Sequence, residues 1–145
     1  MIKVDISTEM KLKSNKALSM YEVNAARHLN RVANQFKNIS SVAMHKSTGG
    51  RFYKVTKTGK PHQASVKGNP PAKDTGRLIN SLFVTPASPT KLSASLSTNV
   101  EYAGFLEDKD NLDRPFMSER SQPFQDTKTF AERVAKDISL GVSKI

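Results

Sequence analysis

Apolar side chains recur every three or four residues between Ser14 and Met44, which is the spacing of one face of an α-helix. Ser14 has a side-chain oxygen that can cap the first turn. The sequence therefore predicts a helix over 14–44, the longest regular element of the chain. The apolar positions of this face are Leu18, Tyr21, Ala25, Leu29, Val32, Phe36, Ile39 and Ala43.

Shorter segments alternate apolar and polar residues, as strands with one buried face do. They are Ile2–Ile6, Phe83–Thr85 and Lys91–Thr98, and in the last of these leucine and alanine alternate with three serines. The apolar and aromatic run Val100–Leu106 is expected to continue the sheet as a third segment.

Two more helices are predicted after residue 73. A short helix over Arg77–Leu82 can be capped by Asp74 or Thr75, whose side-chain oxygens accept first-turn amides. A terminal helix over 124–140 ends before Gly141 and places Phe130, Val134 and Ile138 on one face. The element order predicts an α+β fold for a single domain over 1–145. In that fold a small, mostly antiparallel sheet is packed by a long N-terminal helix and a C-terminal helix.

The segment at about 46–73 has a different composition from its surroundings. It contains four glycines and three prolines but no acidic residue. The strand-like stretches 51–55 and 62–66 flank a turn at 57–60, which predicts a long basic loop or hairpin. This basic arm is either a protruding element that contacts a neighbour or a flexible linker. Its cationic residues are Lys46, Arg51, Lys54, Lys57, Lys60, Lys67 and Lys73.

The formal net charge of +10 comes entirely from the first half of the chain. Residues 1–73 contain 14 Lys/Arg and three acids, whereas residues 74–145 contain nine Lys/Arg and ten acids. A basic region of this kind can contact DNA, an acidic protein surface or lipid headgroups, or it can be a solvated face that only aids solubility.

Other features of the composition narrow the range of functions. The 145 residues suffice for one domain with a modest core, and the absence of cysteine excludes disulfides and thiolate metal sites. The chain lacks the run of ~20 apolar residues that crosses a bilayer, and its first residues do not resemble a signal peptide. We therefore expect no membrane partner.

Catalytic and metal-binding patterns are not found. His28, His45 and His62 follow no metal-binding spacing, and no nucleophile elbow is present. The acidic stretch 107–113 lacks the central glycine of a calcium-binding loop, and Gly49-Gly50 is not followed by the residues of a phosphate-binding loop. The sequence thus predicts a protein that is not an enzyme and needs no cofactor.

Three short blocks between Tyr53 and Phe116 resemble a known family. The first, D-T-G-R-L-x-x-S, follows His62–Ser65 and Gly68–Ala72, and the second and third are Y-A-x-x-L-E and R-P-F. In this order, between a long helix and a terminal helix, they resemble the head–tail joining proteins of tailed bacteriophages, in particular the lambdoid type. These proteins are also called tail-completion or neck proteins. The matching residues are Asp74, Thr75, Gly76, Arg77, Leu78, Ser81, Tyr102, Ala103, Leu106, Glu107, Arg114, Pro115 and Phe116.

The resemblance implies a structural virion protein without a cofactor or a reaction. Copies would form a ring, commonly sixfold, in the virion neck after assembly in the host cytoplasm. The neighbours would be the head connector or stopper and the tail-tube or tail-terminator proteins, with non-specific contact to DNA in the channel. The family usually has a Gly-Thr turn after the Y-A-x-x-L-E block, where this sequence has Asp108-Lys109-Asp110.

The motif residues divide into an expected core and an expected interface. The large apolar residues are expected to form one cluster between helix and sheet, because such side chains are mostly buried. Three charged residues are expected at interfaces, where arginine is common. The expected cluster is Leu78, Leu82, Tyr102, Phe105 and Phe116, and the expected interface residues are Arg77, Glu107 and Arg114.

Two hypotheses about partners remain open at this stage. In one, the basic arm of one subunit docks near residues 107–113 of the next and closes a ring. In the other, the chain is a basic nucleic-acid-binding protein, as its pI of about 9.9 suggests. The arm offers only Phe52 and Tyr53 for base stacking, and no known nucleic-acid-binding motif is present.

Overall fold

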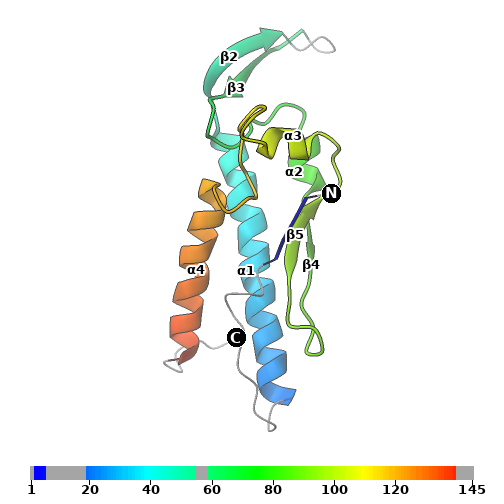
Figure 1. Ribbon diagram of the computed structural model, residues 1–145, viewed down its shortest axis with the longest axis vertical. Coiled ribbons are helices and arrows are strands. Elements are labelled where there is room, and N and C mark those ends of the chain that lie inside the picture. The colour runs from blue at the N-terminus through cyan, green and yellow to red at the C-terminus, as the bar shows by residue number, and fades with distance from the viewer. Residues whose placement is uncertain (1, 6–18, 55–58, 140–145) are drawn as a thin grey trace.

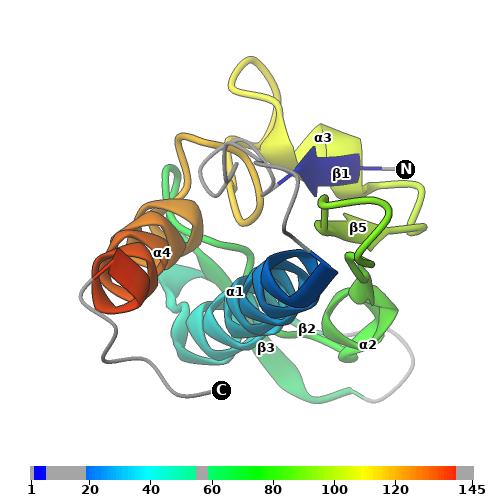
Figure 2. The same cartoon turned by 90° about the horizontal axis from the view of Figure 1, so that it is seen from below.

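A single long helix, α1 (Ser19–Lys46), is the central element of the protein. The computed structural model describes residues 2–5, 19–54 and 59–139. Helix α4 (Gln122–Ser139) lies along one side of α1, and the sheet lies along the other side (Figure 1). The view from below shows the same three layers (Figure 2). These elements confirm the predicted α+β fold.

The helical periodicity of the sequence corresponds to the buried face of α1. Leu29, Val32 and Phe36 are at most 1% exposed. The ring of Phe36 meets that of Phe124 on α4 edge to face, with 5.8 Å between the centroids, which is a favourable aromatic geometry. The predicted cap Ser14 lies outside the described residues. The described helix extends two residues beyond the predicted end at Met44.

The sheet has three antiparallel strands in the order β1 (Ile2–Asp5), β5 (Ser95–Thr98), β4 (Phe83–Thr85). Leu96 at its centre pairs with Val4 on one side and Val84 on the other. All four residues of β5 are buried, so the serine face of this strand is covered as well as the leucine face. The predicted strand was longer, but Lys91 forms only an isolated bridge with Ser88.

Polar side chains of α1 form hydrogen bonds with the loops that pack against this helix. The Asn30 amide nitrogen donates to the Ala87 carbonyl at 3.1 Å, and its carbonyl oxygen accepts from the Ala87 amide at 2.6 Å. The buried Ser40 hydroxyl donates to the Phe116 carbonyl at 3.1 Å. These bonds give partners to backbone groups of the loops that cover α1, where an unpaired buried group would be costly.

The predicted strand over Val100–Leu106 is wrong. This segment forms a turn and then the short helix α3 (Ala103–Glu107). Strand β5 already has a partner on each side, so the sheet offers no free place beside it. Short apolar runs do not by themselves distinguish strands from buried helical turns.

The hairpin prediction for the basic arm is confirmed. Strands β2 (Gly49–Lys54) and β3 (Pro61–Ser65) pair antiparallel, and the hairpin projects beyond the C-terminal end of α1 (Figure 1). The predicted turn residue Lys57 and the predicted strand end Val55 lie outside the described residues. A flexible linker is therefore the wrong description of the described part of the arm.

The expected hydrophobic cluster is only partly correct. Leu78, Leu82 and Phe116 are buried, but Tyr102 is 41% exposed and Phe105 is 52% exposed. Ala103 occupies the buried side of α3, and the two aromatic side chains remain accessible. In the short helix α3 both rings therefore lie on the accessible side, opposite Ala103.

Replacing Phe36 with alanine should lower the free energy of unfolding by about 3–5 kcal/mol, because it empties a fully buried site between α1 and α4. Urea unfolding followed by circular dichroism measures this change. Phe52→Ala is the matched control, because Phe52 is 70% exposed and should change stability by less than about 0.5 kcal/mol. Equal losses in both variants would contradict the assigned core.

Candidate functional site

The three motif blocks are joined to one another near the helices α2 (Arg77–Ser81) and α3. The first and second blocks meet where the Arg77 guanidinium lies over the Tyr102 ring, 5.9 Å from its centroid. The second and third meet where the Glu107 carboxylate accepts amides from the turn that follows Arg114. Residues from Arg77 to Phe116 therefore belong to one structural unit.

Glu107 organises this unit from the inside. Its Oε1 atom accepts three backbone hydrogen bonds, from Phe116 at 2.9 Å, Met117 at 2.6 Å and Ser118 at 3.2 Å. Hydrogen bonds to a charged acceptor are stronger than neutral ones. The carboxylate that the resemblance suggested for an interface is thus used within the subunit.

The R-P-F block is also directed inward. The Arg114 amide donates to the Leu106 carbonyl at 2.6 Å, and its guanidinium donates to the Leu112 carbonyl at 2.7 Å. Pro115 and Phe116 are fully buried. Arg114 therefore shapes its own loop, and the interface role expected for it stays a prediction.

The D-T-G-R-L-x-x-S block forms the start of α2. Gly76 is the capping residue, with a φ of +85° that favours glycine. It makes no side-chain capping bond, but the Thr75 hydroxyl accepts from the Arg77 amide at 3.3 Å, as predicted for one of two candidate caps. Ser81 donates to the Leu78 carbonyl at 2.6 Å and lies 2.5 Å from the Thr98 hydroxyl of β5. Asp74 is exposed.

The loop after α3 is closed by its own acidic side chains. Asp108 accepts from the Asp110 amide at 2.9 Å and from the Asn111 side chain at 2.5 Å, and these two bonds close the turn after α3. Asp113 has a φ of +50° and pairs with Arg120, a residue that the sequence analysis did not single out. No spacing signal would have identified that pair.

The Arg120 hydrogen bond lowers the pKa of the Asp113 carboxyl below its ordinary value. A carboxyl with a lowered folded pKa stabilises the fold above its unfolded pKa, and this contribution is lost as the pH falls through the folded value. The acidic loop is therefore held in place by charge under neutral conditions.

The hairpin exposes an aromatic ring on each of its two faces. Phe52 pairs with Gln63 and is 70% exposed, whereas Tyr53 pairs with His62 on the opposite face and is 54% exposed. Exposed aromatic rings beside cationic side chains are common features of interaction surfaces, where aromatic residues and arginine are enriched. The hairpin is thus the most exposed candidate interaction surface of the described chain.

The base of the hairpin is fixed to the body of the protein. The Gly68 amide donates to the Asp113 carbonyl at 2.7 Å, and the Lys73 amide donates to the Met44 carbonyl at 3.1 Å. A Cβ on Gly50 would lie 2.5 Å from the Ser65 carbonyl oxygen, so only glycine fits between the two strands. The hairpin therefore projects from a defined base.

The cations of the basic arm lie mainly on the surface. The side chain of Lys54 and the whole of Lys57 lie outside the described part of the chain. The other five side chains are exposed, and they are Lys46, Arg51, Lys60, Lys67 and Lys73. The basic arm thus presents positive charge around its exposed rings.

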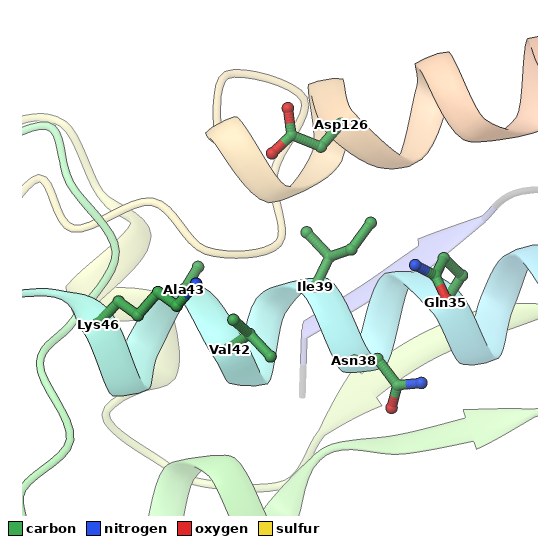
Figure 3. Close-up of a pocket in the computed structure, with 7 residues that line it drawn as sticks. All are labelled: Gln35, Asn38, Ile39, Val42, Ala43, Lys46 and Asp126. Atoms are coloured by element: carbon green, nitrogen blue, oxygen red, sulfur yellow. The ribbon is translucent and has the colours of Figure 1, made fainter.

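An open groove of about 350 Å³ lies between α1 and the first turn of α4 (Figure 3). Its lining combines apolar and amide side chains with one ammonium and one carboxylate, which comes from α4. This lining has no nucleophile paired with a base, so it provides no catalytic arrangement. The lining residues are Gln35, Asn38, Ile39, Val42, Ala43, Lys46 and Asp126.

The histidines are separated from one another in the structure. His28 is buried, and burial together with the nearby Arg31 lowers its pKa, which favours the neutral ring. His45 is exposed and contacts the Ser41 carbonyl. Within residues 2–5, 19–54 and 59–139, no group of three or more His, Asp or Glu side chains could hold a metal ion. No described helix is long and apolar enough to cross a membrane.

Comparison with known proteins leaves the family of this chain open. The sequence matches no protein-family model and no curated protein, and the fold matches no solved structure. The function must therefore be inferred from the motif residues and the exposed surfaces.

Replacing Glu107 with alanine should lower the free energy of unfolding by about 3 kcal/mol or more, because three amides of the turn 116–118 lose their common acceptor. Glu107→Gln retains one acceptor oxygen and should cost only about 1 kcal/mol. Chemical unfolding of both variants measures the difference. A loss no larger for alanine than for glutamine would show that the carboxylate does not organise the turn.

Proposed function

We propose that this protein is a structural subunit of the neck of a tailed bacteriophage. Copies form a ring, commonly of six subunits, that completes the tail and joins it to the head connector. The partners are further copies of the chain, the connector or stopper on one side, and the tail-tube or tail-terminator proteins on the other. The resemblance of the three ordered motif blocks supports this function.

The observation that carries the proposal is the exposure of aromatic side chains at two separate places. Phe52 and Tyr53 are exposed on the hairpin, and Tyr102 and Phe105 are exposed at α3. Aromatic residues and arginine are enriched in the buried centres of protein interfaces. Two such surfaces on one small domain suit a subunit that contacts more than one neighbour.

The motif residues support the same function in two different ways. Glu107, Pro115 and Phe116 fix the turn from within, whereas Arg77 and Tyr102 form an exposed pair on its outer surface. An assembly subunit needs both a rigid frame and an accessible surface, because a pre-formed surface loses less entropy on binding.

A second function is favoured by one specific observation, the absence of acidic residues from the whole segment 46–73. Its cations and its two exposed aromatic rings could contact phosphates and bases, which would make the chain a nucleic-acid-binding protein. The two functions differ in their dependence on salt, because release of counterions from DNA dominates phosphate binding.

Particles produced by the genome that encodes the chain should contain it at the junction between head and tail. We expect that deleting its coding sequence leaves filled heads and unjoined tails, and that supplying the protein in trans restores joined particles. Electron microscopy of the neck and of the deletion lysate measures both outcomes. Joined particles without this protein, or neck density lacking it, would contradict the proposed function.

The nucleic-acid alternative is tested by titrating duplex DNA over a salt series. We expect weak binding, with a Kd above about 1 µM near physiological salt, as for non-specific contacts. Fluorescence anisotropy between about 50 and 200 mM salt measures the affinity and its slope. Tight binding with a steep salt slope would favour the alternative.

A further inference from the structure

We propose that the hairpin of one copy docks on the α3 surface of the next copy, and that this head-to-tail contact builds the ring. The α3 surface consists of Tyr102 and Phe105 with the flanking acids Glu101, Asp108 and Asp110. The inference rests on the proposed self-association and specifies which surfaces meet.

The hairpin supplies the projecting half of this contact. Phe52 and Tyr53 point to opposite faces, so a partner can be engaged by one ring while a second contact covers the other. Arg51 is exposed beside them. The bond from the Gly68 amide to the Asp113 carbonyl fixes the base of the hairpin, and a pre-formed surface loses less entropy on docking.

The α3 surface supplies the receiving half. Tyr102 and Phe105 are three residues apart at a short helix, so their rings lie on the same side of it. Glu101, Asp108 and Asp110 are exposed around them. Arg77 lies over the Tyr102 ring and leaves Phe105, which is 52% exposed, as the more accessible ring.

The charges of the two surfaces are complementary. Residues 49–67 contain five Lys/Arg and no acid, whereas residues 101–113 contain five acids and one lysine. Glu107 and Asp113 are half-buried and bonded within the subunit, whereas Glu101, Asp108 and Asp110 are exposed. Of these three, Asp108 also accepts hydrogen bonds within its own loop. Opposite potentials steer two surfaces together and exclude the wrong register. The groove between α1 and α4 is less suited to the hairpin, because its lining has one carboxylate and also one lysine.

The positions of the two surfaces favour contact between copies over contact within one chain. Seen from below, the hairpin and α3 lie on opposite sides of α1 (Figure 2). Both lie toward the same end of the long axis (Figure 1). A contact between two different surfaces repeats from copy to copy and closes into a ring when the rotation permits. The hairpin extends farther along this axis than α3, so it can reach past its own subunit toward a neighbour.

The test uses two variants of the full chain that each lose one half of the contact. The hairpin variant is Phe52→Ser with Tyr53→Ser, and the surface variant is Phe105→Ser with Asp110→Lys. Tyr21→Ser is the matched control, because Tyr21 is 58% exposed near the far end of α1. Thermal unfolding first establishes that all variants are folded like the wild type.

We expect the wild type and Tyr21→Ser to form the same closed oligomer in native mass spectrometry. Each double variant alone should be at least tenfold weaker in self-association, because aromatic anchors dominate interface energies. When the two variants are mixed, one intact hairpin meets one intact α3 surface. The mixture should therefore stop at a one-to-one dimer.

Three results would overturn the contact. They are unchanged oligomers of both double variants, a mixture that gives no dimer, and a wild type that stays monomeric at every concentration tested. These results are distinguishable from failure of the proposed neck function, which is decided by the presence of the protein in particle necks.

Discussion

One oxygen of the Glu107 side chain accepts three backbone hydrogen bonds, and the rest of this structure depends on this interaction. It holds the turn 116–118 against the end of α3. Phe116 and Met117 are thereby directed into the core, where the Phe116 carbonyl accepts from Ser40 of α1. The same turn leads into α4, so the packing of Phe124 on Phe36 follows from it. Hydrogen bonds from several amides to one carboxylate are strong and directional. In this protein they connect the outer loops to the central helix.

The hydrogen bonds of Glu107 explain how the short segment α3 can contribute both to the core of the protein and to its exposed surface. The inward side of α3 presents Ala103 to the core and Glu107 to the turn, and the outward side presents Tyr102 and Phe105. A five-residue helix has little stability of its own. Its outward rings are therefore positioned by the hydrogen bonds that Glu107 makes on the other side. Stability of the frame and geometry of the exposed surface cannot be varied independently here.

The helices α1 and α4 and the β2–β3 hairpin could be predicted from the sequence, because each depends on a local pattern. Apolar spacing defines α1, and glycine and proline delimit the hairpin strands. The strand predicted over 100–106 failed because a short apolar run does not by itself distinguish a strand from a helical turn. Phe105, which was predicted to lie in the hydrophobic cluster, is exposed instead. The roles of Glu107 and Arg120 depend on turns that bring together residues up to 13 positions apart, which no periodicity indicates. Charge separation between the two halves of the chain was visible in the sequence, but which acids stay exposed was not.

The contacts within one subunit do not explain why the hairpin carries two aromatic residues. A two-stranded hairpin without a covered face is marginally stable in water. In this chain both faces are uncovered, and each presents an aromatic ring that would lower the free energy if it were buried. The base, by contrast, is closely fitted, because Gly50 permits an approach that any Cβ would prevent. The hairpin thus combines a closely packed base with two exposed rings. Contact with another molecule would bury these rings and lower the free energy. The distribution of burial within this one element therefore supports the proposed assembly.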